Sequence, residues 1–543
     1  MSMFISDRVF ENLELPYIFS RIVVYTPYGT DAKKEMKPFL KKDTQKLIEE
    51  YERIEKAVFL ITKHRYTFVD IRTIFQHMKD LRGSFKRAEE NEVLSTVELF
   101  EIKAFMFMLT ELEQKIQKIK WNLPENLKVK PMPSLIKLLD PEKSGVNTFY
   151  IYDMYSKKLQ MIRKQIKDIE ADMYRSKKEA REKIQAELNI KIRPNGETSV
   201  SKSNEEMIAA MEKCPGLVYN SETYMNKTFK VRLENDVDEK LKELEELKLR
   251  EEEEEFEVRK NLTEEIRKAI HDIDGNVSAI ASLDLLIAKG YLAIGMQGVK
   301  PEIVEEETLS IIEGRHIKVA DTLRKQGKEF TPITVNLKKG VTCITGANMG
   351  GKTISLKLIG VLSVMAQYGL FVPAKEMKVS LKDYVFFSLG DLQSTDMGLS
   401  TFGAEILEIK NIISRAEEAG IILIDELARG TNPSEGFAIS KAIINFLKTK
   451  NSITIITTHF DGLTEDQEVY HLQVKGLIGV DYNQLKEEMN KTMNAGIEVV
   501  HKYMDYRLIE VENEQIVPRD AINIARLMGL QEFILKDAEQ CLQ

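Results

Sequence analysis

Gly346-Ala347-Asn348-Met349-Gly350-Gly351-Lys352-Thr353 is the most informative segment of this chain. It has the Gly-x-x-x-x-Gly-Lys-Thr spacing of a phosphate-binding loop, directly after an apolar run and before an apolar helical pattern. Glycines let backbone N–H groups turn inward around phosphate oxygens, and the N-terminus of the following helix adds partial positive charge. We therefore predict an ATP site in which Lys352 contacts the β- and γ-phosphates and the Thr353 hydroxyl binds Mg²⁺. The predicted nucleotide contacts in this segment are Gly346, Ala347, Asn348, Met349, Gly350, Gly351, Lys352, Thr353 and Ile354.

Two later apolar runs, 421–424 and 453–457, predict strands beside the one that precedes this loop. Because such runs alternate with helical patterns after about residue 301, they indicate an α/β domain with a largely parallel sheet. Asp425 and Glu426 follow the first run and His459 follows the second, at the strand ends where ligands bind in such sheets. A carboxylate at a strand end by itself would more simply cap a turn, but the phosphate-binding loop favours catalysis.

These strand-end residues receive separate roles in the prediction. We expect Asp425 to hold Mg²⁺ through water, and Glu426 to orient or deprotonate the attacking water. We expect His459 to sense the γ-phosphate. The predicted catalytic residues are therefore Glu426, His459 and Lys352, and the predicted metal ligands are Thr353 and Asp425.

The first half of the chain has helical periodicity. Up to about residue 130, apolar residues recur every three or four positions, which predicts a helical domain. Two longer helical patterns then flank residues 191–232, where proline and glycine interrupt them. The first helical stretch, 157–193, has twelve Lys or Arg against six acids, and 234–257 has thirteen acids against four bases. We predict a pair of antiparallel arms of opposite charge that carry a small tip.

The predicted domains are therefore a helical core at 1–150, the arms and their tip at 151–300, and the ATPase domain at 301–543. The 543 residues carry a formal net charge of −8, which disfavours a strongly basic nucleic-acid binder but not a local basic face. Three widely spaced cysteines predict neither a disulfide framework nor a zinc site. We expect no membrane span and a cytoplasmic location.

In these motifs the chain resembles the MutS family of ABC-type ATPases. Residues 344–353 are similar to that family's phosphate loop, with Ala347 where proline is usual, and 425–436 are similar to its second acidic motif and the loop after it. The segments 313–316 and 369–374 also match. Two segments are similar in sequence to the second bacterial branch of MutS: Gly390-Asp391-Leu392-Gln393-Ser394 and Asn432-Pro433-Ser434-Glu435-Gly436. The arms and tip look like the family's lever and clamp.

The resemblance implies a homodimer that is joined through the ATPase domain and a C-terminal helical segment. Each ATP would lie between the phosphate loop of one subunit and the signature segment of the other, where Gln393, Ser400 and Thr401 would contact it. Phe330 stands where the family stacks an aromatic ring on adenine. An ordinary core role for Phe330 is an equal alternative.

The chain also departs from the family pattern. Nothing at the start resembles the Phe-x-Glu mismatch wedge, and nothing at the end resembles the basic nuclease-like extension of the second branch. We therefore expect neither mismatch readout nor DNA nicking.

Two functions remain open at this point. The first is an ATP-gated dimeric clamp on duplex or branched DNA, supported by the basic stretch 175–193. The second is an ATP-driven protein-remodelling factor, such as a reactivase of a cobalamin-dependent aminomutase, which suits the net charge and the acidic arm. We favour DNA because the lever-and-clamp plan resembles that of the family.

Overall fold

The computed structural model describes residues 4–143, 145, 148–232, 235–346, 351–389, 401–428, 431–460, 462–478, 480, 503–511, 522, 525–526 and 530–541. The fold is a mixture of helices and α/β structure, as predicted. The chain divides into two compact units, one of residues 1–76, 119–121 and 280–543 and the other of 77–118 and 122–279. These units interleave along the chain, so the motif-based division at residues 150 and 300 stays a prediction.

The first unit begins with short helices and one long helix. These are α1 (Asp7–Asn12), α2 (Leu15–Ser20), α3 (Pro27–Lys34), α4 (Thr44–Lys63) and α5 (Arg65–His77). The α4 sequence places Leu47, Tyr51 and Ile54 on one buried face at three- and four-residue spacing. Thr26 caps α3 by accepting a hydrogen bond from the Gly29 N–H, and Pro27 occupies the first helical position. The helical pattern predicted from the sequence is confirmed here.

The C-terminal part of this unit contains a six-stranded sheet in the order β13-β12-β7-β11-β10-β9. Its strands are β7 (Gly340–Thr345), β9 (Tyr384–Ser388), β10 (Gly420–Ile424), β11 (Ile453–Thr457), β12 (Tyr470–Gly476) and β13 (Asp505–Glu510). All neighbours pair in parallel except β13, which runs antiparallel to β12. Every residue of β7, β10 and β11 is buried, as expected for central parallel strands. The predicted parallel sheet is confirmed.

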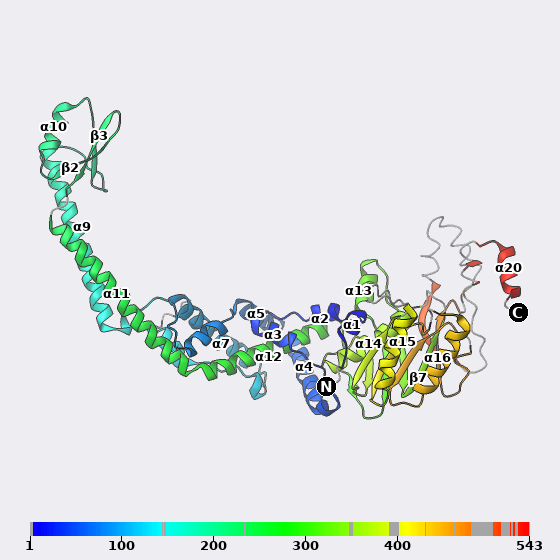
Figure 1. Ribbon diagram of the computed structural model, residues 1–543. Coiled ribbons are helices and arrows are strands. Elements are labelled where there is room, and N and C mark those ends of the chain that lie inside the picture. Colours follow the sequence, from blue (N-terminus) through cyan, green and yellow to red (C-terminus); the bar gives the residue numbers. More distant parts are fainter. Residues whose placement is uncertain are drawn as a thin grey trace. The chain divides into compact units, whose positions relative to one another are not determined.

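Three helices pack against this sheet (Figure 1). They are α14 (Lys352–Gln367), α15 (Thr401–Ser414) and α16 (Pro433–Leu447). Side chains alternate across a strand, so Ile422 and Ile424 of β10 join the core cluster under α15 and α16. Leu423 points the other way, where a Cβ added to Gly360 of α14 would lie 2.7 Å from Leu423 Cδ1. The sheet is therefore packed tightly on α14, the helix that begins at the phosphate loop.

A second, four-stranded sheet has the order β4-β8-β5-β6. Its strands are β4 (Glu302–Ile303), β5 (Thr308–Gly314), β6 (Ile333–Lys338) and β8 (Glu376–Val379). The C-terminal part also contains the helices α13 (Ile317–Lys325) and α20 (Glu532–Cys541). Strand β6 also contacts β13, which joins the two sheets.

The second unit contains the predicted arms. Its helices are α6 (Arg82–Glu89), α7 (Thr96–Lys118), α8 (Pro133–Leu139), α9 (Lys157–Leu188), α10 (Glu205–Lys213) and α11 (Asn235–Lys268), and its strands are β1 (Glu197–Ser201), β2 (Leu217–Glu222) and β3 (Asn226–Val231). Helices α9 and α11 run side by side (Figure 1). Arg163 bonds Glu251, whereas Ile166, further along α9, packs with Leu247, so the pair is antiparallel.

The arm pair ends in a small tip. Here β1, β3 and β2 form an antiparallel sheet that packs with α10 on Ile184, near the end of α9. The pair of long helices and the tip match the arrangement inferred from the charge and proline pattern. Their roles as lever and clamp stay predictions.

Among the described residues, one helix, α12 (Ile270–Gly295), is long and apolar enough by composition to cross a bilayer, and 61% of its most apolar window is buried within the protein. Burial of this extent is typical of a core helix. The three cysteines form no disulfide: Cys214 and Cys343 are buried, and Cys541 is exposed.

Candidate nucleotide-binding site

The two ends of the phosphate loop have backbone angles that favour glycine. Gly346 has φ of 129° and Gly351 has φ of 85°, both in the region that side chains rarely adopt. A Cβ at Gly346 would also lie 3.2 Å from the Val474 Cβ on β12. The loop therefore leaves β7 and enters α14 through two turns that only glycine makes without strain. Ala347, Asn348, Met349 and Gly350 lie outside the described residues.

Lys352 opens α14 and is buried, with 4% of its surface exposed. Its Nζ donates a hydrogen bond to the Gly346 carbonyl at 2.7 Å and lies 3.2 Å from His459 Nε2. The ammonium group thus lies beside Gly346, the first residue of the predicted phosphate loop. A phosphate oxygen would offer this cation a stronger, charge-assisted bond than the carbonyl does.

Asp425 is held at the end of β10 by hydroxyl groups from two other elements. Thr353 Oγ1 on α14 donates to Asp425 Oδ2 at 2.7 Å, and Thr457 Oγ1 at the end of β11 donates to Asp425 Oδ1 at 2.6 Å. A hydroxyl oxygen and a carboxylate in contact are the hard donors that Mg²⁺ takes from proteins, with water and phosphate oxygens completing its shell. Within the described part of the chain no group of three or more His, Cys, Asp or Glu could hold a metal.

Glu426 and His459 face each other across the neighbouring strand ends. Glu426 Oε1 lies 2.9 Å from His459 Nε2, and the Glu426 N–H donates to Thr457 Oγ1 at 2.9 Å. Glu426 has φ of 54°, a left-handed conformation that costs on the order of 1–3 kcal/mol in a residue other than glycine. Such local strain is frequent at functional sites, and here the strained residue carries the carboxylate that contacts His459.

His459 Nε2 cannot bond both of its neighbours at once. The contact with Glu426 needs a proton on Nε2, whereas the contact with the Lys352 ammonium needs a free lone pair there. The side chain is 41% exposed, so it can reorient when a ligand arrives. This competition makes His459 a suitable sensor of whatever occupies the space beside Lys352.

The structure brings together Lys352, Thr353, Asp425, Glu426 and His459, which the sequence assigned to one site. Ile354 is half-buried on α14 beside them, and Phe330 is half-buried just before β6. Gln393 and Ser400 lie outside the described residues, and Thr401 begins α15 without a described side chain. The nucleotide contacts of all these residues stay predictions.

Sequence reasoning missed several residues that shape the site. Thr457 links Asp425 to Glu426, and His471 Nε2 on β12 bonds Thr345 Oγ1 at 2.8 Å, directly before the loop. Burial lowers the pKa of His471, which favours its neutral form. The only sequence signal for Thr457 was its place at the end of an apolar run.

Two further side chains were also missed. Glu405 of α15 accepts a hydrogen bond from the Ala428 N–H at 2.7 Å, and burial raises the pKa of Glu405. The Tyr506 ring of β13 lies against Gly351, where an added Cβ would be 3.1 Å from Tyr506 Cδ1. Burial raises the pKa of Tyr506 as well. Both side chains come from elements whose neighbours in space the sequence pattern did not reveal.

Comparison with known proteins finds a family match over the part of the chain that contains these residues. Residues 342–543, which include Lys352, Asp425 and His459, match the family model of MutS domain V. Endonuclease MutS2 of Caldanaerobacter subterraneus subsp. tengcongensis is 28% identical over 98% of this chain and 64% of its own length. Residues 342–543 thus match a domain of the MutS family, and the chain is similar to a MutS2 protein over most of its length.

Other relatives come from both branches of the MutS family. Endonuclease MutS2 of Halothermothrix orenii is 30% identical over 71% of this chain and 49% of its own length. The DNA mismatch repair protein MutS of Aquifex pyrophilus is 27% identical over 91% of this chain and 56% of its own length. The chain thus spans about half to two thirds of the length of these relatives.

Proposed function

We propose that this protein is a member of the MutS family that binds ATP with Mg²⁺, hydrolyses it, and uses the cycle to act on DNA as a dimer. The observation that carries the proposal is the convergence of Lys352, Thr353, Asp425, Glu426 and His459 from one helix start and two strand ends. A cation, a pair of hard oxygen donors and a carboxylate that can take a proton are the groups that phosphoryl transfer to water requires.

In the proposed reaction, the Lys352 ammonium exchanges the Gly346 carbonyl for phosphate oxygens. Mg²⁺, held by Thr353 and Asp425, would neutralise charge on the β- and γ-phosphates. Glu426 orients a water molecule whose oxygen bonds the γ-phosphorus while the bond to ADP breaks, and the released proton passes to the carboxylate. His459, freed from one of its two contacts, donates toward the γ-phosphate.

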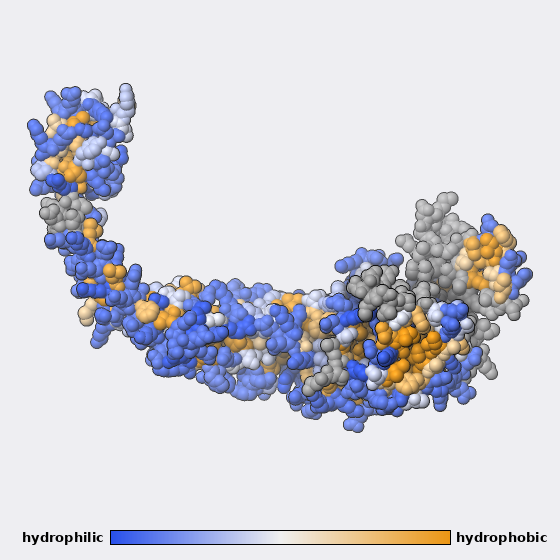
Figure 2. All heavy atoms as spheres, viewed as in Figure 1, coloured by the Kyte–Doolittle hydropathy of each residue, from blue (hydrophilic) through white to orange (hydrophobic). Residues whose placement is uncertain are grey.

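A homodimer is supported by apolar surface on the ATPase domain. Figure 2 shows hydrophobic residues gathered over α15 and α16 on the viewed face. Leu407 and Ile413 of α15 and Phe446 of α16 are 46%, 42% and 37% exposed. Exposed apolar patches of this kind mark protein interfaces. We propose that a second copy covers this surface and adds Gln393, Ser400 and Thr401 to the nucleotide.

DNA binding is supported by a basic stripe on α9. Lys164 and Lys167 are exposed, make no ion pair with any described residue, and lie opposite the seam residues Ile162 and Ile166. Arg175 and Lys178 continue the same face by helical spacing. A row of cations along a helix suits a phosphate backbone, whether of duplex or branched DNA. Use of ATP and DNA would place the protein in the cytoplasm.

A protein client is the second candidate, favoured by the acidic run of α11. Part of this run is already neutralised, because Glu251 and Glu255 bond Arg163 and Glu254 bonds Lys158. Glu252 and Glu253 stay exposed. The acidic surface left for a client is therefore smaller than the sequence indicates, which favours DNA.

The test is steady-state ATP hydrolysis at low salt, alone and with duplex or four-way-junction DNA. Lys352→Ala and Glu426→Gln should each abolish turnover, and the Glu426→Gln protein should still bind ATP. Glu376→Gln is the matched control, because the Glu376 side chain is exposed at the start of β8. Hydrolysis by Glu426→Gln at the wild-type rate would refute the mechanism. Turnover indifferent to every DNA, with no DNA binding, would favour the protein client.

The composite site has its own test. A mixture of Ser400→Ala and Lys352→Ala proteins should recover part of the activity, because one site per mixed dimer is intact. Absence of recovery in confirmed mixed dimers would show that each site is completed within one chain.

A further inference from the structure

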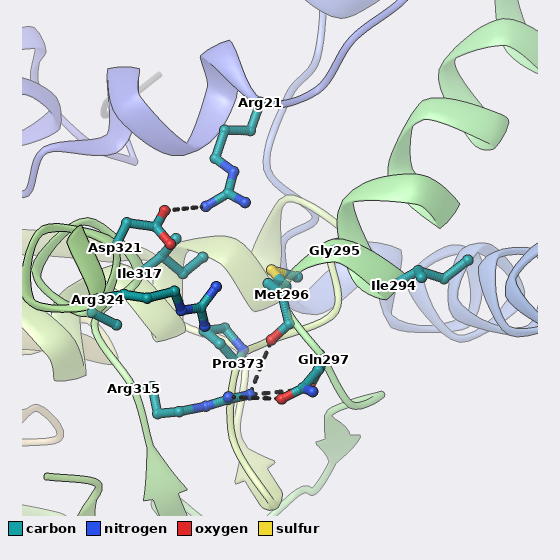
Figure 3. A pocket seen from close by; sticks show the side chains of 11 residues that line it. Arg21, Ile294, Gly295, Met296, Gln297, Arg315, Ile317, Asp321, Arg324 and Pro373 are labelled. Atoms are coloured by element: carbon teal, nitrogen blue, oxygen red, sulfur yellow. Dashed lines mark hydrogen bonds and ion pairs between the residues drawn. The ribbon is translucent and has the colours of Figure 1, made fainter. Parts of the chain in front are cut away.

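A recess of about 180 Å³ lies in the first unit, away from the nucleotide site (Figure 3). It is formed by the end of α2, the residues that follow α12, the loop after β5, and α13. Its lining residues are Arg21, Ile294, Gly295, Met296, Gln297, Arg315, Ile317, Ala320, Asp321, Arg324 and Pro373. Three of these carry a guanidinium group and one carries a carboxylate, so the recess has an excess of positive charge.

The first guanidinium group is fixed by backbone carbonyls. Arg315 Nη2 donates to the Met296 carbonyl at 3.0 Å and to the Gln297 carbonyl at 3.2 Å, and Nη1 donates to Gln297 Oε1 at 3.1 Å. These bonds satisfy carbonyl groups just past the C-terminus of α12, where the helix dipole is negative. Arg315 thereby neutralises the negative end of the α12 dipole, which would otherwise repel an anion from this side of the recess.

The other two guanidinium groups keep donors available. Arg21 uses Nη1 for Asp321 Oδ2 at 2.5 Å, and the Tyr17 hydroxyl donates to the same oxygen at 2.7 Å. The Arg324 side chain has no hydrogen bond or ion pair with any residue in the described part of the chain. Figure 3 shows the guanidinium of Arg324 turned into the recess between those of Arg21 and Arg315. Each guanidinium has five N–H donors, so most donors of Arg21 and all those of Arg324 have no acceptor among the residues that the structure describes.

A second cavity, of about 150 Å³, adjoins the recess and shares Arg21 and Gly295 with it. Its lining includes Tyr25, Arg72 and Tyr291. The Arg72 guanidinium carbon lies 4.7 Å from the Tyr25 ring centroid and 4.6 Å from that of Tyr291. A flat ring bound beside these groups would find an aromatic and cationic surface.

We propose that the recess binds the phosphate group of a small molecule, with Arg324 and Arg21 as its ligands. A planar guanidinium fork matches phosphate oxygens in geometry and charge, and two such forks converge here from α2 and α13. The ligand is either a free phosphate or pyrophosphate, or a nucleotide whose base enters the second cavity. This site is separate from the ATP site and does not depend on the proposed ATPase activity.

The experiment is isothermal titration of the full chain with pyrophosphate and, separately, with AMP. Lys352→Ala removes the principal cation of the ATP site, so binding that survives this change belongs elsewhere. Arg324→Gln should then weaken that binding about tenfold or more, as expected when a charge-assisted hydrogen bond is removed. Lys325→Gln is the matched control, because Lys325 is the next residue of α13, carries the same charge and does not line the recess. The thermal midpoint of Arg324→Gln without ligand should equal that of the wild type.

The two ligands separate the possible sources. Tighter binding of AMP than of pyrophosphate, lost in Tyr291→Ala, identifies a nucleotide. Equal binding identifies a free phosphate or pyrophosphate. Complete loss of binding in Lys352→Ala would overturn the proposal, as would equal losses in Arg324→Gln and Lys325→Gln. Loss of duplex DNA binding, with pyrophosphate binding unchanged in Arg324→Gln, would also overturn it, since the group would then contact nucleic acid.

Discussion

The nucleotide site and the root of the arms both depend on charged side chains, but their surroundings differ. At the nucleotide site, both carboxylate oxygens of Asp425 accept hydrogen bonds from threonine hydroxyl groups. The strands β10 and β11, which carry this carboxylate and one of these hydroxyl groups at their ends, are wholly buried. At the root of the arms, Arg163 bonds Asp153, Glu251 and Glu255 over a seam whose buried residues are Ile162, Ile166 and Leu247.

This difference teaches where rigidity comes from in the two regions. A wide apolar core holds the side chains of the proposed nucleotide site in place before any ligand binds. The arms have a narrow apolar seam, so ion pairs contribute a larger share of what keeps α9 on α11. A substitution at the nucleotide site should therefore change ATP hydrolysis without local unfolding. A substitution at the root of the arms should loosen the two helices without changing ATP hydrolysis.

The largest effect is expected from Asp425→Asn. The substitution keeps one acceptor for the threonine hydroxyl groups but removes the charge that Mg²⁺ needs, so ATP hydrolysis should fall by about 100-fold or more. Steady-state hydrolysis at saturating Mg²⁺ measures this. Asp383→Asn, directly before β9 at the amino ends of the parallel strands, is the control and should hydrolyse ATP normally. Near wild-type turnover in Asp425→Asn would mean that the site holds its metal differently.

At the arm root, Arg163→Ala should loosen the paired helices. It leaves Glu251, Glu255 and Asp153 close together without their shared cation, at a cost of about 2 kcal/mol, or roughly 30-fold in amide exchange. Hydrogen exchange of peptides from α9 and α11 measures the change, and ATP hydrolysis without DNA should stay the same. Arg175→Ala loses one exposed pair with Asp172 and should change exchange little. Equal exchange in the two variants would show that the apolar seam alone holds the arms.

A smaller effect is expected on DNA binding. Lys164→Gln with Lys167→Gln should reduce affinity for duplex DNA at low salt and lower the slope of log affinity against log salt by about 2, or about 0.9 for each phosphate that the protein no longer neutralises. Fluorescence anisotropy across a salt series measures both. Lys177→Gln with Lys183→Gln removes the same charge from the flanks of the same helix. If both pairs reduce the slope equally, the stripe has no special role.

The sequence predicted those parts of the molecule that local patterns encode. Residues 346–353, the strand ends at Asp425 and His459, and the paired arms all appear as spacing, charge or periodicity within one segment. What it did not predict depends on which strands and helices become neighbours. The Tyr51 hydroxyl donates to the Ala366 carbonyl at 2.6 Å, which ties the N-terminal helices to the end of α14, and no local pattern indicates that contact. The position of His471 could not be predicted either, because no pattern within β12 indicates that this strand pairs with β7.

Tyr506 tests how far such a contact matters for the site. It reaches Gly351 only because β13 folds back antiparallel onto β12, and its ring then fills the space beside the turn into α14. Tyr506→Ala should raise the KM for ATP by about fivefold, since a looser turn holds the phosphate loop less well, while kcat changes less. Tyr506→Phe keeps the ring and should restore the wild-type KM. If Tyr506→Phe is as impaired as Tyr506→Ala, the hydroxyl group and not the packing of the ring supports the loop, and the rigidity ascribed to the apolar core would then depend partly on a polar contact.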